Sequence, residues 1–374
     1  MSKKLIIFGN GLGMALNPDH FLLTNAMTRV WDCPTRLSVG EKTTLGSLKG
    51  IETATGPKNE DELATAQVAL AYLSSFRAEL GDEALSEWFK EDALNYPGTL
   101  NKYVFEVAYE LYSYLIPEEQ RTLWKDFLTS LTCFIRDTRS HIATLNYDDL
   151  LYAPFVDGHH FIEGGKTKWL CLTKKDPESS NIAPYLRDGF FKGAGQTLTA
   201  FTPDSFNWAG DCGYYLHLHG SPLYVSDTDA RKLNRSEVAT STRTLRRHIV
   251  LANRKDKETI IRRSEILSDY WDNRLPKCIA DAEEIILFGY SGLDLHLNEL
   301  IRDKHDGPIH VVEWSGSTHY PLSTDENVLE HDPISAKEFW GSVSVLSVPE
   351  ANVHRMKNIL EFREWSNPDD CVPF

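Results

Sequence analysis

LIIFGNGLGMAL, residues 5–16, is the stretch that decides the fold. Its first four residues are apolar and predict a buried β-strand, and the glycine-rich turn GNGLG at 9–13 then leads into a helix. Glycines let a backbone approach a phosphate closely, and a helix start offers N–H groups and a positive dipole end. The loop is therefore a candidate diphosphate cradle. Because the spacing is G-x-G-x-G and not the full G-x-G-x-x-G, a turn that binds no ligand stays open as the alternative.

The composition is that of an ordinary globular chain of 374 residues, 41% hydrophobic and 25% charged. No apolar run reaches the roughly 18 residues that span a bilayer, and the first apolar stretch is too short for a secretory signal, so we expect a cytoplasmic protein without membrane contact. The net charge of −15 argues against nonspecific nucleic-acid binding by the whole surface. The six cysteines form no C-x-x-C pair, and we predict no metal.

Short apolar runs predict a Rossmann-like α/β fold, with a doubly wound, mostly parallel sheet covered on both faces. The predicted strands are 5–8, 141–145, 214–219, 284–288, 310–314 and 343–348. Apolar residues at helical spacing predict helices over 61–76, 103–115, 118–134, 262–282 and 352–362. We expect one domain over 1–374, with a helical insertion at 58–135 and a loop-rich insertion at 153–213.

Polar motifs follow three of the predicted strands at their carboxyl ends, where a doubly wound sheet gathers its functional residues. NYDD at 146–149 follows the second strand, HGS at 219–221 ends the third, and GYSGLD at 289–294 follows the fourth. Each motif alone has a structural interpretation, as a helix cap, a buried core histidine or a strand-to-helix turn. Together with the glycine-rich loop, they predict one site.

The four motifs resemble the sirtuin-like family, in its bacterial antiphage-defence branch. The matching segments are GNG at 9–11, TLNYD at 144–148, LHGS at 218–221 and FGYSGLD at 288–294, and Pro18-Asp19-x-Phe21 is similar to the P-D-F segment of the sirtuin cofactor loop. Zinc-binding sirtuin deacylases carry paired cysteines beyond the catalytic histidine, and this chain has none. The resemblance therefore favours the branch that hydrolyses NAD over the deacylases.

This resemblance implies that NAD is the substrate, cleaved to nicotinamide and ADP-ribose, with Asn146, Asp148 and His219 as catalytic residues. An amide can position a water and ribose hydroxyls, a carboxylate favours positive charge on the sugar, and an imidazole can take a proton near neutral pH. His217, two residues earlier on the predicted strand, would point to the same face and is the alternative base. The expected NAD-binding residues are Gly9, Asn10, Gly11, Leu12, Gly13, Asp19, Gly289, Ser291, Asp294 and Glu313.

Residues 231–263 hold eleven lysines and arginines against three acids. This segment is either a solvated helical face or a surface for an acidic partner, a nucleic acid or a second protomer. By resemblance, we expect a homo-oligomer whose activity is controlled by a separately encoded partner, such as a HerA-type hexameric ATPase. The region 61–134 is the candidate assembly surface, and direct nucleic-acid binding stays open.

Three alternative functions also stay open. A deacylase or an ADP-ribosyl transferase would use the same cofactor pocket. A non-catalytic ADP-ribose or nucleotide sensor would bind the ligand without turnover. A nuclease-associated subunit would use the basic segment, although the sequence offers no clustered set of metal-binding carboxylates.

Overall fold

The computed structural model describes residues 3–47, 51–63, 66–69, 91–163, 166–173, 184–191, 199–203, 212–226, 229–243, 245–251, 254–320 and 332–365. The helix predicted at 61–76 is helical at 61–63 and 66–69, and its remainder lies outside the described residues. Within these ranges no helix combines the length and the apolar character needed to cross a membrane.

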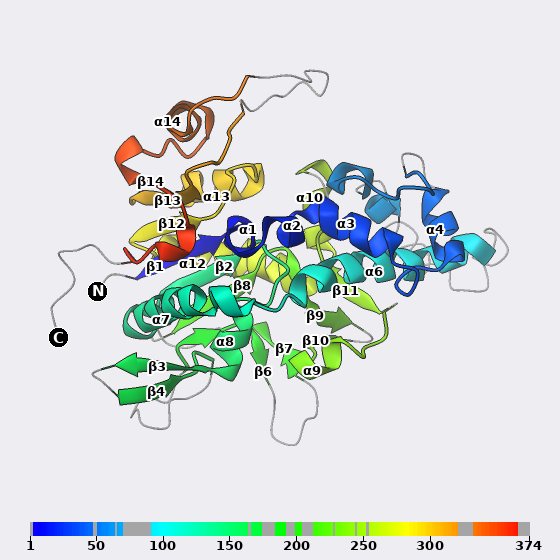
Figure 1. The fold of residues 1–374 in the computed structure, drawn as a ribbon, viewed down its shortest axis with the longest axis horizontal. Helices are drawn as coiled ribbons and strands as arrows, with labels where there is room; N and C mark the ends of the chain where they lie inside the picture. Colours follow the sequence, from blue (N-terminus) through cyan, green and yellow to red (C-terminus); the bar gives the residue numbers. More distant parts are fainter. Residues whose placement is uncertain are drawn as a thin grey trace.

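Seven parallel strands form the central sheet, in the order β14-β13-β12-β1-β2-β8-β5 (Figure 1). The strands are β1 (Lys4–Phe8), β2 (His141–Thr144), β5 (Leu186–Arg187), β8 (Gly213–His217), β12 (Glu284–Phe288), β13 (Ile309–Trp314) and β14 (Val353–Met356). A parallel sheet flanked by helices is the Rossmann-like α/β fold that the sequence predicts, and this prediction is confirmed.

The first strand is the innermost one because its side chains are apolar on both faces. Leu5, Ile6 and Ile7 are fully buried, and β1 pairs with β12 on one side and β2 on the other. Complete burial of such a side chain stabilises the fold by about 1.5–3 kcal/mol. The strand therefore fixes the middle of the sheet and the place where its own glycine-rich loop emerges.

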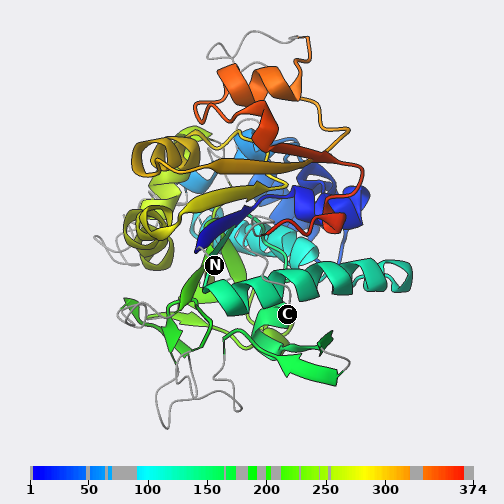
Figure 2. The ribbon, with the colours of Figure 1, turned by 90° about the vertical axis from the view of Figure 1, so that its left-hand side faces the viewer.

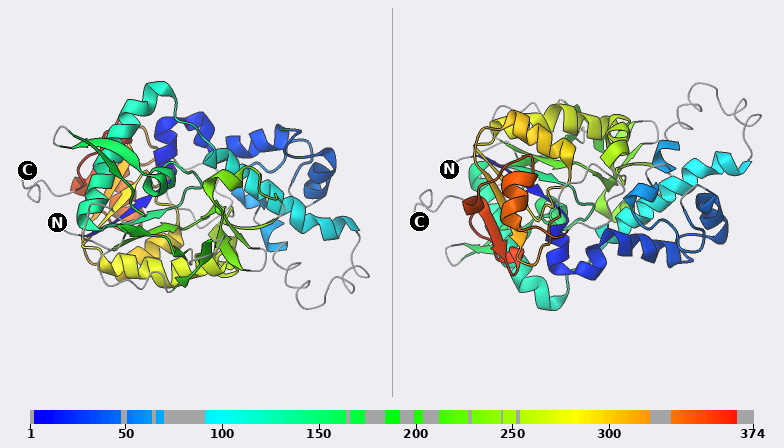
Figure 3. Two further views of the ribbon diagram at one scale, coloured as in Figure 1. Left: turned by 90° about the horizontal axis from the view of Figure 1, so that it is seen from below. Right: turned by 90° about the horizontal axis from the view of Figure 1, so that it is seen from above.

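Helices cover both faces of this sheet, as the two turned views show (Figures 2 and 3). The helices α12 (Leu275–Asp281) and α13 (Leu295–Lys304) lie on one face, and α1 (Gly11–Leu16) and α7 (Arg121–Thr138) lie on the other. The helix α7 buries an apolar stripe that includes Phe127 and Leu131. It ends where Arg139 takes a left-handed conformation with φ of 59°.

A second, five-stranded antiparallel sheet lies beside the first, in the order β11-β9-β10-β7-β6. Its strands are β6 (Phe190–Phe191), β7 (Thr199–Phe201), β9 (Gly220–Ser226), β10 (Ala230–Lys232) and β11 (Arg246–Ile249). The region predicted as loop-rich also contains α8 (Tyr152–Asp157) and the hairpin of β3 (His159–Glu163) and β4 (Lys166–Leu170). Its described parts are short strands joined by irregular segments.

The helices α3 (Leu23–Asp32), α4 (Val39–Gly46) and α6 (Glu91–Tyr112) pack together at one end of the molecule, and α6 also contacts β9 and β11 (Figure 1). The helical region predicted at 58–135 is thus shared between two places, because α6 joins α3 and α4 whereas α7 lies on the central sheet. The remaining short helices are α2 (Pro18–Phe21), α9 (Arg235–Val238), α10 (Arg254–Arg262), α11 (Glu265–Asp269) and α14 (Ala336–Glu338).

Two predictions for the C-terminal part are wrong. Residues 343–348 form no strand, because Ser347 has a φ of 49° and the Ser344 hydroxyl accepts a hydrogen bond from the Leu346 backbone, which together make a turn. The seventh strand is β14, inside the stretch predicted as a helix at 352–362. It is an edge strand whose side chains are mostly half-buried, so it lacks the continuous apolar run that marks the inner strands.

The loops after β1 and β12 meet where the strand order reverses. The chain leaves β1 toward β2 and leaves β12 toward β13 on the opposite side, which makes this a topological switch point. The Gly11 N–H donates to the Gly289 carbonyl at 2.8 Å. A Cβ atom on Gly9 would lie 2.6 Å from the same carbonyl oxygen. Glycine is therefore required at position 9 because the two backbones touch there.

We expect Gly9→Ala to lower the free energy of unfolding by about 1–3 kcal/mol, because the new methyl group overlaps the Gly289 backbone. Gly40→Ala is the matched control, since Gly40 lies in α4 with open space around its Cα, and alanine is the better helix former by roughly 1 kcal/mol. Urea unfolding of both variants checks this. Equal or greater stability of Gly9→Ala would contradict the tight contact between the loops.

Candidate active site

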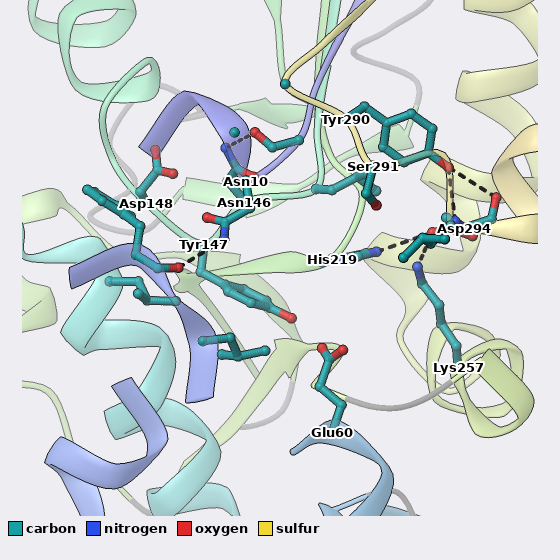
Figure 4. Close-up of a pocket in the computed structure, with 18 of the residues that line it drawn as sticks. Asn10, Glu60, Asn146, Tyr147, Asp148, His219, Lys257, Tyr290, Ser291 and Asp294 are labelled. Carbon is teal, nitrogen blue, oxygen red and sulfur yellow. Dashed lines mark hydrogen bonds and ion pairs between the residues drawn. The ribbon is translucent and has the colours of Figure 1, made fainter. Parts of the chain in front are cut away.

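A cavity of about 1340 Å³ opens at the carboxyl ends of β1, β2 and β12. Typical ligand pockets occupy about 300–1,000 Å³, so this one is large enough for an extended ligand. Its walls are formed by the loops after these strands, by His219 beyond the end of β8, by the segment 59–61 and by Lys257 of α10 (Figure 4). The three residues predicted to be catalytic, Asn146, Asp148 and His219, all line it.

Asn146 is held in one orientation directly after β2 and is 5% exposed. Its Nδ2 donates to the Gly9 carbonyl at 3.0 Å, and its backbone N–H donates to Thr144 Oγ1 at 3.1 Å. Its Oδ1 is buried and has no hydrogen-bond partner within the described part of the chain. Leaving a buried acceptor unpaired costs about 1–3 kcal/mol, so this oxygen is available to a donor that enters the cavity.

Asp148 is a buried carboxyl group whose Oδ1 accepts from the Leu150 backbone N–H at 3.1 Å. Burial raises the pKa of Asp148 to about 7, and the charge of Asp149 adds to the rise, while hydrogen bonds from Leu150 and Asn146 oppose it. The group therefore changes charge near neutral pH. A cationic ligand beside it would favour its ionised form.

His219 presents a neutral imidazole to the cavity. Its Nε2 lies 3.6 Å from Asp294 Oδ2, too far for a hydrogen bond, and has no hydrogen-bond partner among the residues described. Burial lowers the pKa of His219 to about 4 and the charge of Lys257 lowers it further, although Asp294 and a hydrogen bond to the Leu145 backbone oppose this. An uncharged ring with an unpaired nitrogen is what a proton acceptor requires.

His217 does not share this position, and the prediction that the two histidines face the same side is wrong. The strand β8 ends at His217, and the chain turns at Leu218 and His219. His217 Nδ1 lies 2.9 Å from the Tyr224 hydroxyl, and its ring packs against Tyr152 with centroids 5.2 Å apart. His217 is therefore a buried core residue and not an alternative base in this cavity.

Asp294 links the imidazole to a lysine. Its Oδ1 caps α13 by accepting from the Leu297 N–H at 3.3 Å, and its Oδ2 forms an ion pair with Lys257 Nζ. Burial would raise the pKa of Asp294, but the ion pair with Lys257 holds that pKa below its usual value. Figure 4 shows the side chains of His219 and Lys257 pointing toward this carboxylate. Asp294 is therefore a permanent negative charge on the wall.

The glycine-rich loop offers fewer free N–H groups than the sequence predicts. The Gly9 N–H donates to the Phe288 carbonyl at 2.9 Å, the Gly11 N–H to Gly289 at 2.8 Å, and the Leu12 N–H to Gly9 at 3.2 Å. The first two donors join the loop of β1 to β12 and its loop, and the third closes a turn within the loop of β1. The expected cradle of backbone N–H groups is thus not available at these three positions.

Only part of this loop reaches the cavity. Gly9, Asn10 and Gly11 line it, whereas Leu12 and Gly13 do not. A Cβ atom on Gly13 would lie 2.5 Å from the Phe21 ring, so this glycine lets an aromatic side chain pack on α1. The predicted contacts of Leu12 and Gly13 with a ligand are therefore replaced by packing roles.

Gly289, Ser291 and Asp294 line the cavity as predicted, but Asp19 and Glu313 do not. Asp19 is exposed on α2. Glu313 is 3% exposed at the end of β13. Its carboxylate accepts from the His319 and Trp340 rings at 2.9 Å each and pairs with Arg355 at 2.9 Å. Glu313, expected among the NAD-binding residues, thus belongs to a buried network outside this cavity.

Among the lining residues that the sequence did not predict, three bear on the chemistry of the site. Tyr147 lies inside the NYDD motif and its hydroxyl donates to the Val250 carbonyl, so its ring forms a wall between Asn146 and His219 (Figure 4). Lys257 belongs to the basic segment, which stands out in the sequence, but the sequence does not indicate that this segment reaches the cavity. Glu60 faces the cavity from the opposite side and gave no signal at all. Burial raises the pKa of Glu60 to about 7.

Many of the described side chains in the basic segment 231–263 are engaged in contacts within the protein. Several of its cations form ion pairs within the protein, namely Lys232–Asp188, Arg235–Asp149, Arg243–Glu106, Lys257–Asp294 and Arg262–Glu258. Arg247 is buried, with its guanidinium carbon 4.3 Å from the Phe105 ring centroid and its NH1 donating to the Pro222 carbonyl at 3.1 Å. Much of the local positive charge is thus used to join helices and strands.

The chain matches no protein-family model and has no significant match among curated proteins.

We expect stability to fall as pH rises through neutrality because of Asp148. Folding raises the pKa of this carboxyl from an ordinary 3.8 to about 7. Its stabilising contribution to the free energy of unfolding is therefore complete below the pKa of the unfolded chain and is lost as the pH rises through the pKa of the folded chain. Between pH 5 and 8, wild type should lose roughly 1–3 kcal/mol of unfolding free energy relative to Asp148→Asn. Urea unfolding across this pH range measures the difference.

Asp303→Asn is the control for this titration, because the Asp303 side chain is 59% exposed. Its stability should follow the wild-type profile at every pH. Parallel profiles for wild type and Asp148→Asn would show that burial does not perturb this carboxyl.

Proposed function

We propose that this protein hydrolyses NAD to nicotinamide and ADP-ribose in the cavity at the switch point. The proposal rests on one observation: Asn146 and His219 line the same cavity, and each has a buried polar atom, Oδ1 and Nε2 respectively, without a partner in the described structure. A hydrogen-bond acceptor and a neutral base beside one cavity are the groups that a water attack on a sugar carbon needs. The motifs that resemble the sirtuin-like family supply the identity of the substrate.

The reaction breaks the bond between the ribose C1′ and the pyridinium nitrogen. The bonding electrons leave with nicotinamide, which becomes neutral, while positive charge develops on the ribose. Water forms the new C1′–O bond and loses one proton. The enzyme must hold the water against the face of the ribose that lies opposite the departing nicotinamide, and it must accept that proton.

Asn146 and His219 fit the water side of this reaction. The amide of Asn146 is fixed through its Nδ2, so Oδ1 accepts a hydrogen bond from water or from a ribose hydroxyl at a defined place. The His219 imidazole is neutral at physiological pH and accepts the proton at Nε2. Tyr147 lines the cavity as well and adds an aromatic ring to this part of it.

Asp148 fits the sugar side. A positively charged pyridinium ring favours the ionised form of a carboxyl whose pKa lies at about 7. The resulting carboxylate hydrogen-bonds the carboxamide N–H groups and stabilises the positive charge that develops on the ribose. The protonation state of Asp148 thus depends on whether a cationic ring is bound in the cavity.

We further propose that this activity depletes cellular NAD in antiphage defence, in a cytoplasmic homo-oligomer controlled by a separately encoded HerA-type hexameric ATPase. This part rests on the resemblance of the motifs. Light scattering of the purified chain, alone and mixed with an ATPase encoded beside it, tests the assembly. A monodisperse monomer that does not change with concentration or partner would contradict it.

For the reaction, we expect Asn146→Ala and His219→Ala each to lower kcat for NAD hydrolysis by at least about 100-fold, because each removes one polar group from the reacting water. His160→Ala, an exposed histidine on the β3–β4 hairpin, should keep full activity. Proton NMR detects the release of nicotinamide and ADP-ribose and so measures these rates, with and without the ATPase.

The same assay separates the alternatives. Full turnover by Asn146→Ala and His219→Ala would contradict the assigned site. Consumption of an acyl-lysine peptide in step with NAD would select a deacylase, and transfer of ADP-ribose to protein would select a transferase. Tight binding of ADP-ribose without any turnover, with or without the partner, would select a nucleotide sensor.

A further inference from the structure

The cavity that would receive a dinucleotide is rich in carboxyl groups. Glu60, Asp61, Asp148 and Asp294 all line it. A diphosphate adds two negative charges and is strongly disfavoured there unless a cation lies beside it. Lys257 is the one lysine or arginine among the lining residues that the structure describes.

Three backbone donors of the loop expected to hold a diphosphate are already used. The N–H groups of Gly9 and Gly11 donate to the Phe288 and Gly289 carbonyls, and the N–H group of Leu12 donates to the Gly9 carbonyl within its own loop. Binding an anion through Gly9 and Gly11 would break the contact with the loop after β12. A positively charged side chain at the cavity wall would supply what these three groups do not.

Lys257 is positioned to be that side chain. It extends from α10 to the cavity wall, where its Nζ pairs with Asp294 Oδ2 beside His219 (Figure 4). Its side chain is 11% exposed, and its Nζ lies 5.6 Å from the centroid of the Trp271 ring. The carboxylate and the aromatic face together hold the ammonium group at the cavity rather than in solvent.

We propose that Lys257 binds the diphosphate of the dinucleotide and that Asp294 is the counter-ion that holds its ammonium group in place before the ligand binds. The identity of the ligand rests on the proposed function. An ammonium group carries three donors, so it contacts a phosphate oxygen while keeping its bond to Asp294. The site then needs no free N–H group in the glycine-rich loop.

This arrangement also connects ligand binding to the proton acceptor. The charge of Lys257 lowers the pKa of His219, whereas Asp294 raises it. A bound diphosphate offsets the lysine charge and so raises the pKa of His219. Tyr147 faces the imidazole from the loop after β2, with ring centroids 6.2 Å apart, and Glu60 and Asp61 face the cavity from the opposite wall.

The test is calorimetric binding of ADP-ribose to the full-length chain. We expect Lys257→Met to weaken binding at least tenfold and Lys257→Arg, which keeps the charge, to weaken it less than threefold. Lys304→Met, an exposed position on α13, is the matched control and should bind like wild type. Inorganic pyrophosphate as a competitor should displace ADP-ribose from wild type and not from Lys257→Met.

Unchanged binding by Lys257→Met would overturn the proposal. So would an equal loss in Lys257→Met and Lys257→Arg when both have the wild-type unfolding midpoint, because shape and not charge would then matter. Absence of ADP-ribose binding by wild type would overturn it as well. NAD turnover, measured on the same samples, is separate: wild type that binds ADP-ribose through Lys257 and never hydrolyses NAD would contradict only the proposed function.

A second readout excludes a purely structural role for the lysine. NMR titration of the His219 ring should show its pKa rising when wild type is saturated with ADP-ribose. In Lys257→Met without ligand, the His219 pKa should already exceed the wild-type value, and ADP-ribose should change it little. An identical His219 titration in wild type and Lys257→Met would contradict the link between the two residues.

Discussion

A direct contact between two backbones, at the loops after β1 and β12, sets the geometry of the whole site. The sheet order makes these strands neighbours, and Gly9, Gly11 and Gly289 remove every side chain that would keep their loops apart. Gly9 in turn accepts the hydrogen bond that orients Asn146. The cavity therefore begins where two apolar strands end, and its polar groups are held by the loop that joins them.

The same burial that builds the cavity gives its ionisable groups unusual properties. Asp148 and Glu60 have a pKa raised to about 7, whereas His219 is held neutral. Asp294 stays ionised because Lys257 pairs with it. In the function and the lysine role that we propose, a cationic ring ionises the carboxyl beside it, and an anion on the lysine makes the imidazole more basic.

The sequence predicted the fold well where residues are buried on both faces. The inner strands of the sheet are continuous apolar runs and were located to within two residues, and the motifs at their ends meet in space because parallel strands end on one edge. The edge strand β14 was missed because its half-buried residues carry no such run. Lys257 and Glu60 were missed for another reason: their role depends on long-range packing that places α10 and the segment 59–61 opposite the sheet.

The glycine-rich loop at 9–13 has a structural explanation. GNGLG suggested a phosphate cradle, but two of its N–H groups join two loops, a third closes a turn within its own loop, and Gly13 accommodates the Phe21 ring. Packing alone thus explains the motif, and a lysine far along the chain takes over the electrostatic task in our proposal. The arrangement of Asn146 and His219, and not the glycine pattern, is what supports a catalytic interpretation.

The most direct measurement is a crystal structure of the Asn146→Ala variant soaked with NAD. We predict an intact dinucleotide in the cavity, with its nicotinamide ribose between position 146 and His219 and its diphosphate against Lys257. A dinucleotide bound elsewhere, or one in this cavity whose reacting ribose lies away from His219, would contradict this prediction.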